Sequence, residues 1–203
     1  MFMFNQTRKM LLSPPWLLVL ACCCLLTSSP LLAKETALDS ELRNLLINAI
    51  NDSESFQNRF DAEVWLLDMS QRLQRRVRKQ DKKTQLGLLK LIHAEATRAE
   101  LAPELVLAVI EVESNFDRWA LSHAGAQGLM QVMPFWLKEI GKPGDNLFHV
   151  QTNLRLGCTI LKYYLDKENG DLTRGLARYN GSLGRNVYPN KVFNALRERW
   201  YRQ

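Results

Sequence analysis

The sequence has few residues of the kinds that form disulfides or bind metals. Three of its four cysteines are consecutive, at positions 22–24, which leaves Cys158 as the fourth. The three histidines lie far apart in the sequence: His93, His123 and His149. Zinc sites use closely spaced ligand pairs, which are missing here, so we expect no metal site. Cys158 on these spacings is expected to be a small buried apolar residue rather than part of a disulfide framework or a nucleophile.

The absence of other sequence features excludes further classes of protein. No phosphate-binding loop, dinucleotide fingerprint, internal repeat or low-complexity tract is present, so no cofactor is expected. With 46% hydrophobic and 24% charged residues, the composition is that of a globular protein rather than a disordered, collagen-like or polytopic membrane protein. The net charge of +6 is a mild excess and predicts no nucleic-acid partner, because it is not concentrated with interleaved aromatic residues.

The N-terminus predicts export. An uninterrupted apolar run over 16–26 follows two basic residues and is too short to cross a bilayer of roughly 30 Å. This pattern is typical of a signal peptide, and we assign residues 1–33 as a signal peptide or lipoprotein leader. Cleavage after Ala33 is one interpretation. Lipidation of Cys22, which ends a sequence resembling a bacterial lipobox, is another, and an uncleaved anchor is a third. The expected location is the periplasm or cell envelope, with membrane attachment through the leader or a lipidated Cys22 left open.

The rest of the chain has helical periodicity and little strand signal. Helices are expected over about 40–50, 60–79 and 84–99, and residues 34–87 are predicted to form a basic helical extension of unassigned role. The second of these helices ends in a cluster of basic residues: Arg72, Arg75, Arg76, Arg78, Lys79, Lys82 and Lys83. We interpret the cluster as a solvated helix end rather than an anionic-polymer or membrane-binding patch, since cations complement the helix dipole there.

Two candidate catalytic carboxylates follow an apolar helix. Residues 105–110 are all apolar, which predicts a core helix, and Glu111 and Glu113 follow directly. A separation of two residues corresponds to a rotation of about 200° around a helix, so the two carboxylates cannot share one pocket. One is expected at a site and the other at solvent or a salt-bridge partner. Burial and a helix C-terminus both raise a carboxyl pKa, as a general acid working near neutral pH requires.

Two later segments carry further polar groups. A glycine-containing run over 124–134 allows sharp backbone turns and includes Gln131, which offers both a donor and an acceptor. Asp171 is expected to cap a helix that ends at Tyr179, Asn180 and Gly181. That end places a phenol and an amide side by side at a loop.

Together these segments resemble a known family. The matching motifs, in order, are Glu113-Ser114-x-Phe116, Gly128-Leu129-Met130-Gln131-x-Met133-Pro134 and Tyr179-Asn180-Gly181. They are similar to the SLT domain of soluble-type lytic transglycosylases over about 90–200, and we assign this domain to 88–203. The family more often has Tyr-Asn-Ala-Gly at this place, whereas this chain has Tyr179-Asn180-Gly181-Ser182. The resemblance implies a mainly α, lysozyme-like domain preceded by the helical extension.

The resemblance also implies an activity. The family cleaves the β-1,4 bond between N-acetylmuramic acid and N-acetylglucosamine in peptidoglycan glycan strands without water, giving 1,6-anhydro ends during cell-wall remodelling. Its catalytic acid corresponds to Glu113. Substrate-binding positions correspond to the following: Ser114, Met130 lining the groove, Gln131, Tyr179 with its hydroxyl toward Glu113, and Asn180. A lysozyme-type muramidase and a non-catalytic peptidoglycan-binding envelope protein are the alternatives, and no protein partner is identified.

Overall fold

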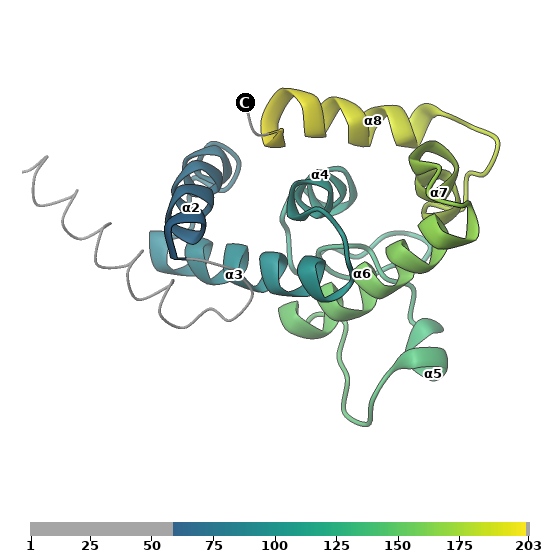
Figure 1. The fold of residues 1–203 in the computed structure, drawn as a ribbon. Coiled ribbons are helices and arrows are strands. Elements are labelled where there is room, and N and C mark those ends of the chain that lie inside the picture. Colours follow the sequence, from purple (N-terminus) through teal and green to yellow (C-terminus); the bar gives the residue numbers. More distant parts are fainter. Residues whose placement is uncertain (1–58, 202–203) are drawn as a thin grey trace, which may run out of the picture. The chain divides into compact units, whose positions relative to one another are not determined.

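The computed structural model describes residues 59–201 (Figure 1). The leader expected over 1–33, the helix expected over 40–50 and the first part of the extension expected over 34–87 lie outside the described residues. The described elements are α2 (Arg59–Gln74), α3 (Lys82–Arg98), α4 (Pro103–Ser114), α5 (Trp136–Ile140), α6 (Val150–Lys167), α7 (Leu172–Tyr179), α8 (Val187–Ala195) and the π-helical turn η1 (Leu196–Trp200). Within 59–201 the only β pairing consists of two isolated bridges, so the mainly α class is confirmed.

Several helix ends follow directly from the local sequence. Helix α4 begins at Pro103, whose missing amide hydrogen costs nothing in the first turn, and has Glu104 near the positive end of its dipole. Asp171 accepts a hydrogen bond from the Arg174 amide (3.0 Å) and caps α7, as predicted. The short helix α5 stops at Gly141.

Helix α2 ends earlier than the predicted boundary near 79, because a tight turn separates it from α3. Asp81 caps α3 by accepting a hydrogen bond from the Thr84 amide (2.9 Å). The buried Gln85 amide donates to the carbonyl of Gln80 (2.9 Å) and to the side chain of Gln74 (3.0 Å), which holds the turn closed. The turn is therefore fixed by a side chain that belongs to the following helix.

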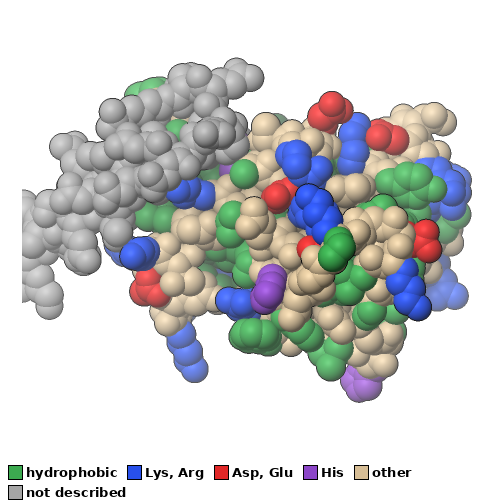
Figure 2. All heavy atoms as spheres, turned by 90° about the horizontal axis from the view of Figure 1, so that it is seen from below, with side chains coloured by type: hydrophobic (Ala, Val, Ile, Leu, Met, Phe, Trp, Pro, Cys, Tyr) green, Lys and Arg blue, Asp and Glu red, His purple; other side chains and the backbone are tan. Residues whose placement is uncertain are grey.

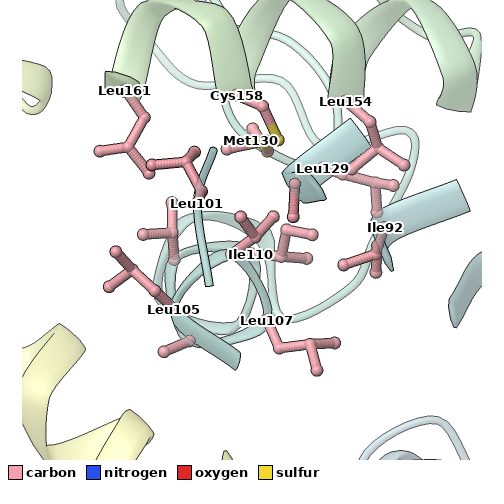
Figure 3. Packing of buried hydrophobic residues seen from close by; sticks show 14 of the residues in the cluster. Ile92, Leu101, Leu105, Leu107, Ile110, Leu129, Met130, Leu154, Cys158 and Leu161 are labelled. Carbon is pink, nitrogen blue, oxygen red and sulfur yellow. Dashed lines mark hydrogen bonds between the residues drawn. The ribbon is translucent and has the colours of Figure 1, made fainter. Parts of the chain in front are cut away.

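Helix α4 is the centre of the core. It packs against α3, α8 and η1, and every residue over 105–110 is buried. Leu129 and Met130 lie between α4 and α6, beside Ile110 and Cys158 (Figure 3). Burying each large apolar side chain contributes about 1.5–3 kcal/mol, so this helix has a fixed position. Cys158 is fully buried, as expected, and burial raises its pKa to about 12.

Helix α2 is attached to the same core. The Trp65 indole donates to the Glu104 carboxylate at the start of α4 (2.8 Å), and the Arg72 guanidinium donates to the Arg199 carbonyl in η1 (2.9 Å). The boundary expected between 87 and 88 falls inside α3. The described end of the extension therefore contacts two elements of the downstream domain.

The surface shows no field of a single charge sign on the face drawn in Figure 2, where basic, acidic and hydrophobic side chains are interspersed. Two members of the basic cluster, Arg72 and Arg76, are engaged in ion pairs with Asp68 and Glu111. Over residues 59–201, no helix combines the length and apolarity needed to cross a membrane.

Candidate active site

Glu113 lies in the last turn of α4, where the core helix reaches the surface. Its carboxyl oxygen Oε1 accepts a hydrogen bond from the Tyr188 hydroxyl on α8 (2.6 Å). Helix α4 ends one residue later, because Asn115 adopts a left-handed conformation (φ 48°). The rigid apolar part of α4 thus holds the acid at a fixed place, and a residue 75 positions away supplies its partner.

The surroundings of Glu113 favour its protonated form. Burial raises its pKa from 4.5 to about 7, and the hydrogen bond from Tyr188 opposes part of that rise. Burial disfavours a carboxylate because the charge loses its hydration. A carboxyl group with a pKa near 7 is half protonated at neutral pH, and can both donate and accept a proton during a reaction.

An open groove of about 390 Å³ gives Glu113 access to a ligand. Its lining residues come from α4, the end of α7, the following loop and α8: Val112, Glu113, Asn180, Ser182, Arg185, Val187, Tyr188 and Lys191. Glu113 is the one carboxylic acid among them. Asp117, four residues further on, is not a lining residue, and its carboxylate accepts a hydrogen bond from the Trp119 amide (2.9 Å).

Glu111 points away from this groove, which confirms that the two carboxylates diverge. It is buried, and its oxygens contact the Arg76 guanidinium, the Arg199 Nε atom (2.7 Å) and the Trp200 indole nitrogen (2.8 Å). A buried carboxylate needs such partners, because an unpaired charge away from water is costly. Glu111 therefore links the turn after α2 to η1 and leaves Glu113 alone at the groove.

The glycine-containing run forms a loop over 127–131 that is fixed by a buried amide. Asn153 on α6, only 1% exposed, accepts a hydrogen bond from the Met130 amide (2.8 Å) and donates to the carbonyls of Gln127 and Leu147 (2.8 Å each). Gly128 has a positive φ of 74°, and a Cβ atom there would lie 2.6 Å from the Leu147 carbonyl oxygen. Glycine is required because the backbone is left-handed and a second chain segment approaches closely.

Three of the expected substrate-binding residues hold this loop in place. The Ser114 hydroxyl donates to the Leu129 carbonyl (2.8 Å), and the Gln131 side-chain amide donates to the carbonyls of Gly128 (3.0 Å) and Ala120 (3.2 Å). The Tyr179 hydroxyl donates to the Met130 carbonyl (2.7 Å). The loop is therefore tied to α4 and α7 as well as to α6.

Two expectations about individual side chains are corrected. Met130 does not line the groove with its side chain, which is fully buried and has its sulfur 3.9 Å from the Cys158 sulfur. The Tyr179 hydroxyl bonds to the Met130 carbonyl, and Tyr188 is the tyrosine that donates to Glu113. The reason is that α8 lies against α4, so the tyrosine in its first turn reaches the acid.

Asn180 and Tyr188 are two further polar residues that line the groove. Asn180 caps the end of α7, is exposed and lines the groove beside Glu113, and its contact with substrate stays a prediction. Tyr188 and Asn153 were not among the site residues predicted from the sequence. Both lie outside the three motifs, and each makes its contact with a residue far away in the chain.

The fold and the site together define a class: a helical domain that presents one carboxylic acid, with a raised pKa, in an open groove. The model of the transglycosylase SLT domain family matches residues 90–198. This match covers more than half of the chain, and the chain belongs to that family.

Similar proteins carry related names. The chain is 32% identical over 108 residues to a transglycosylase of Enterobacteria phage PRD1, covering 50% of this chain and 40% of that protein. It is 30% identical over 139 residues to membrane-bound lytic murein transglycosylase C of Histophilus somni (strain 2336), covering 56% and 38%. The chain thus spans about two fifths of the length of these curated relatives.

Two solved structures are also similar to parts of this chain. An inactive mutant of lytic transglycosylase Slt from Pseudomonas aeruginosa is 26% identical, with a TM-score of 0.43, covering 52% of this chain and 20% of that one. The 70-kDa soluble lytic transglycosylase from Escherichia coli is 18% identical, with a TM-score of 0.38, covering 80% and 38%.

Proposed function

We propose that this protein is a peptidoglycan lytic transglycosylase that cleaves the β-1,4 bond between N-acetylmuramic acid and N-acetylglucosamine without water. The observation that carries the proposal is Glu113, a single carboxylic acid in the groove with a pKa of about 7. Glycosidases that hydrolyse this type of bond generally use a pair of carboxylates at a defined separation. Family membership supplies the substrate class, and the lone acid favours a mechanism that needs no second carboxylate.

The reaction proposed for this site has two proton transfers through one group. Glu113 first gives its proton to the glycosidic oxygen as the bond from that oxygen to C1 of muramic acid breaks, and the N-acetylglucosamine end leaves as an alcohol. The Glu113 carboxylate then takes the proton of the C6 hydroxyl while the C6 oxygen bonds to C1. This closes the 1,6-anhydro ring and restores the acid. The substrate N-acetyl group stabilises C1 between the two steps, in place of a second carboxylate.

The residues around Glu113 support these steps in different ways. Tyr188 fixes the orientation of the carboxyl group through its hydrogen bond (2.6 Å). Asn180 offers an exposed amide to the sugar from the end of α7. Ser114, Gln131 and Tyr179 act on the loop over 127–131, which they hold beside the end of α4. Holding reacting groups within a fraction of an ångström is a large part of such a rate enhancement.

The product of the reaction tests the proposal. We expect mass spectrometry of digested peptidoglycan to find muropeptides with 1,6-anhydro ends, which are lighter than reducing ends by one water molecule. Reducing ends would instead show a muramidase that uses water. Binding of glycan strands with no cleavage by the wild-type protein would show a non-catalytic envelope protein.

The pH dependence tests the role of the acid. Because Glu113 must be protonated in the free enzyme, kcat/KM is expected to fall above about pH 7, with its alkaline limb set by that pKa. The hydrogen bond from Tyr188 lowers the pKa, so Tyr188→Phe should move the limb to higher pH. The loss of orientation should also lower kcat/KM on the order of 10- to 100-fold. Tyr163→Phe, at an exposed tyrosine on α6, is the matched control and should leave the profile unchanged.

The cell envelope is the proposed place of action. Peptidoglycan, the proposed substrate, lies in the envelope, and the curated relatives from Histophilus somni are named as membrane-bound. Residues 1–33 are proposed as the export leader, with Cys22 as the position that lipidation would use.

A further inference from the structure

Two basic side chains in the groove have no partner in the described structure. Arg185 lies in the loop between α7 and α8, and Lys191 lies on α8, three residues after Tyr188. Both are exposed, and neither forms an ion pair or a side-chain hydrogen bond with residues 59–201. By contrast, Arg174 and Arg178 on the neighbouring helix both bind the buried carboxylate of Glu168. The groove therefore contains two cations that pair with no other described residue and are available to solvent or a ligand.

The start of α8 adds to this positive character. Its N-cap residue, Asn186, makes no side-chain capping bond, and its first turn holds no acidic residue. The unpaired amides at a helix start carry a partial positive charge. This helix start lies between Arg185 and Lys191 in sequence, and Glu113 is the one acidic residue lining the groove. The combination suits a ligand that brings its own negative charge close to the reacting acid.

On the basis of the function proposed above, we propose that Arg185 and Lys191 bind carboxylates attached to muramic acid and so make the enzyme selective for acidic, peptide-bearing glycan. Muramic acid carries a lactyl group, and in peptidoglycan this group is joined to a peptide with free carboxylates. The sugar backbone itself is neutral. Carboxylates next to the scissile bond are therefore the substrate groups that two unpartnered cations can recognise, and they come from either the peptide or the lactyl group.

The size of the effect follows from exposure. An exposed ion pair is worth about 0.2–1 kcal/mol, so two of them correspond to a selectivity of roughly 2- to 30-fold. Since both side chains are in contact with water, this selectivity should fall as salt concentration rises. Neither cation takes part in the proton transfers at Glu113.

Three substrates separate the sources of charge. The first is intact peptidoglycan strands. The second is strands whose peptides have been removed enzymatically, which keep the lactyl carboxylate alone. The third is intact strands whose carboxylates have been coupled to a neutral amine. The measurement is kcat/KM for release of 1,6-anhydro ends on each. The wild-type protein is expected to prefer intact over amine-coupled strands by several-fold. The lactyl carboxylate is free only after the peptide is removed, so cleavage of stripped strands shows whether it can replace the peptide carboxylates.

Arg185→Gln/Lys191→Gln should bring the ratio of kcat/KM between intact and amine-coupled strands close to one. The control, Arg197→Gln/Lys142→Gln, removes two exposed charges outside the groove lining and should keep the wild-type ratio. An unchanged ratio in the groove variant, with normal thermal unfolding, would overturn this inference while leaving the proposed function intact. A wild-type ratio of one would overturn it too. Failure of the wild-type protein to form anhydro ends on any substrate would overturn both.

Discussion

Glu113→Gln is expected to abolish glycan cleavage, with a loss of kcat of roughly 10²- to 10⁴-fold or more, because general acid catalysis contributes about that much. Glutamine keeps the shape of the side chain and can still accept the Tyr188 hydrogen bond, but it has no proton to give to the glycosidic oxygen. Release of anhydro ends from intact peptidoglycan measures the loss. Glu139→Gln, at an exposed glutamate on α5, is the matched control and should keep wild-type activity.

The same variant is expected to be more stable than the wild type above pH 7. The pKa of Glu113 is about 7 in the folded protein, above its ordinary value of 4.5. Between these values the folded state holds a proton that the unfolded state has lost, so the free energy of unfolding falls as pH rises through this window. Glutamine does not titrate, so the variant should gain about 2–3 kcal/mol on the wild type between pH 4.5 and pH 7.

Urea unfolding at pH 4.5 and pH 8 measures this difference. A variant that keeps more than a tenth of wild-type activity would show that another group supplies the proton. A stability difference that does not change with pH would show that burial does not raise the pKa of Glu113. The two readouts are independent, because one follows the reaction and the other follows proton binding to the resting protein.

Asn153→Leu is expected to lower the free energy of unfolding by about 3–5 kcal/mol. Leucine has nearly the same volume but leaves two backbone groups without their partners, the amide of Met130 and the carbonyl of Leu147. The carbonyl of Gln127 loses one of its two hydrogen bonds and keeps the one from the Val132 amide (3.0 Å). Each such group costs about 1–3 kcal/mol when it loses its hydrogen bond away from water. The loop over 127–131 would also loosen beside the end of α4, so cleavage should fall in parallel.

Chemical denaturation with activity measured on the folded fraction tests this prediction. Asn190→Leu, at an exposed asparagine on α8, should change the free energy of unfolding by less than about 0.5 kcal/mol. If Asn153→Leu unfolded at the wild-type denaturant concentration, the loop would have to be held by Ser114, Gln131 and Tyr179 alone.

The sequence by itself determined the helical class and the approximate helix positions, and it was sufficient to propose Glu113 as the acid. Apolar residues over 105–110 predict a core helix because they leave it no polar face, and the structure confirms it. The spacing of Glu111 and Glu113 predicts that only one of them enters a site, because helix geometry separates their side chains. Pro103, Asp171 and Gly141 act on their own neighbours, so their effects on helix ends were predictable.

Only the tertiary structure decided which side chains meet Glu113 and what the other motif residues do. Tyr179 and Tyr188 are chemically alike, and the packing of α8 on α4 gives the contact with the acid to Tyr188. Met130 follows a glycine that permits a sharp turn, and that turn places its side chain in the core beside Cys158. The roles proposed for Asn153, Arg185 and Lys191 depend on segments far away in the chain. Local sequence sets backbone conformation over a few residues, whereas the partners of a side chain depend on how whole helices pack.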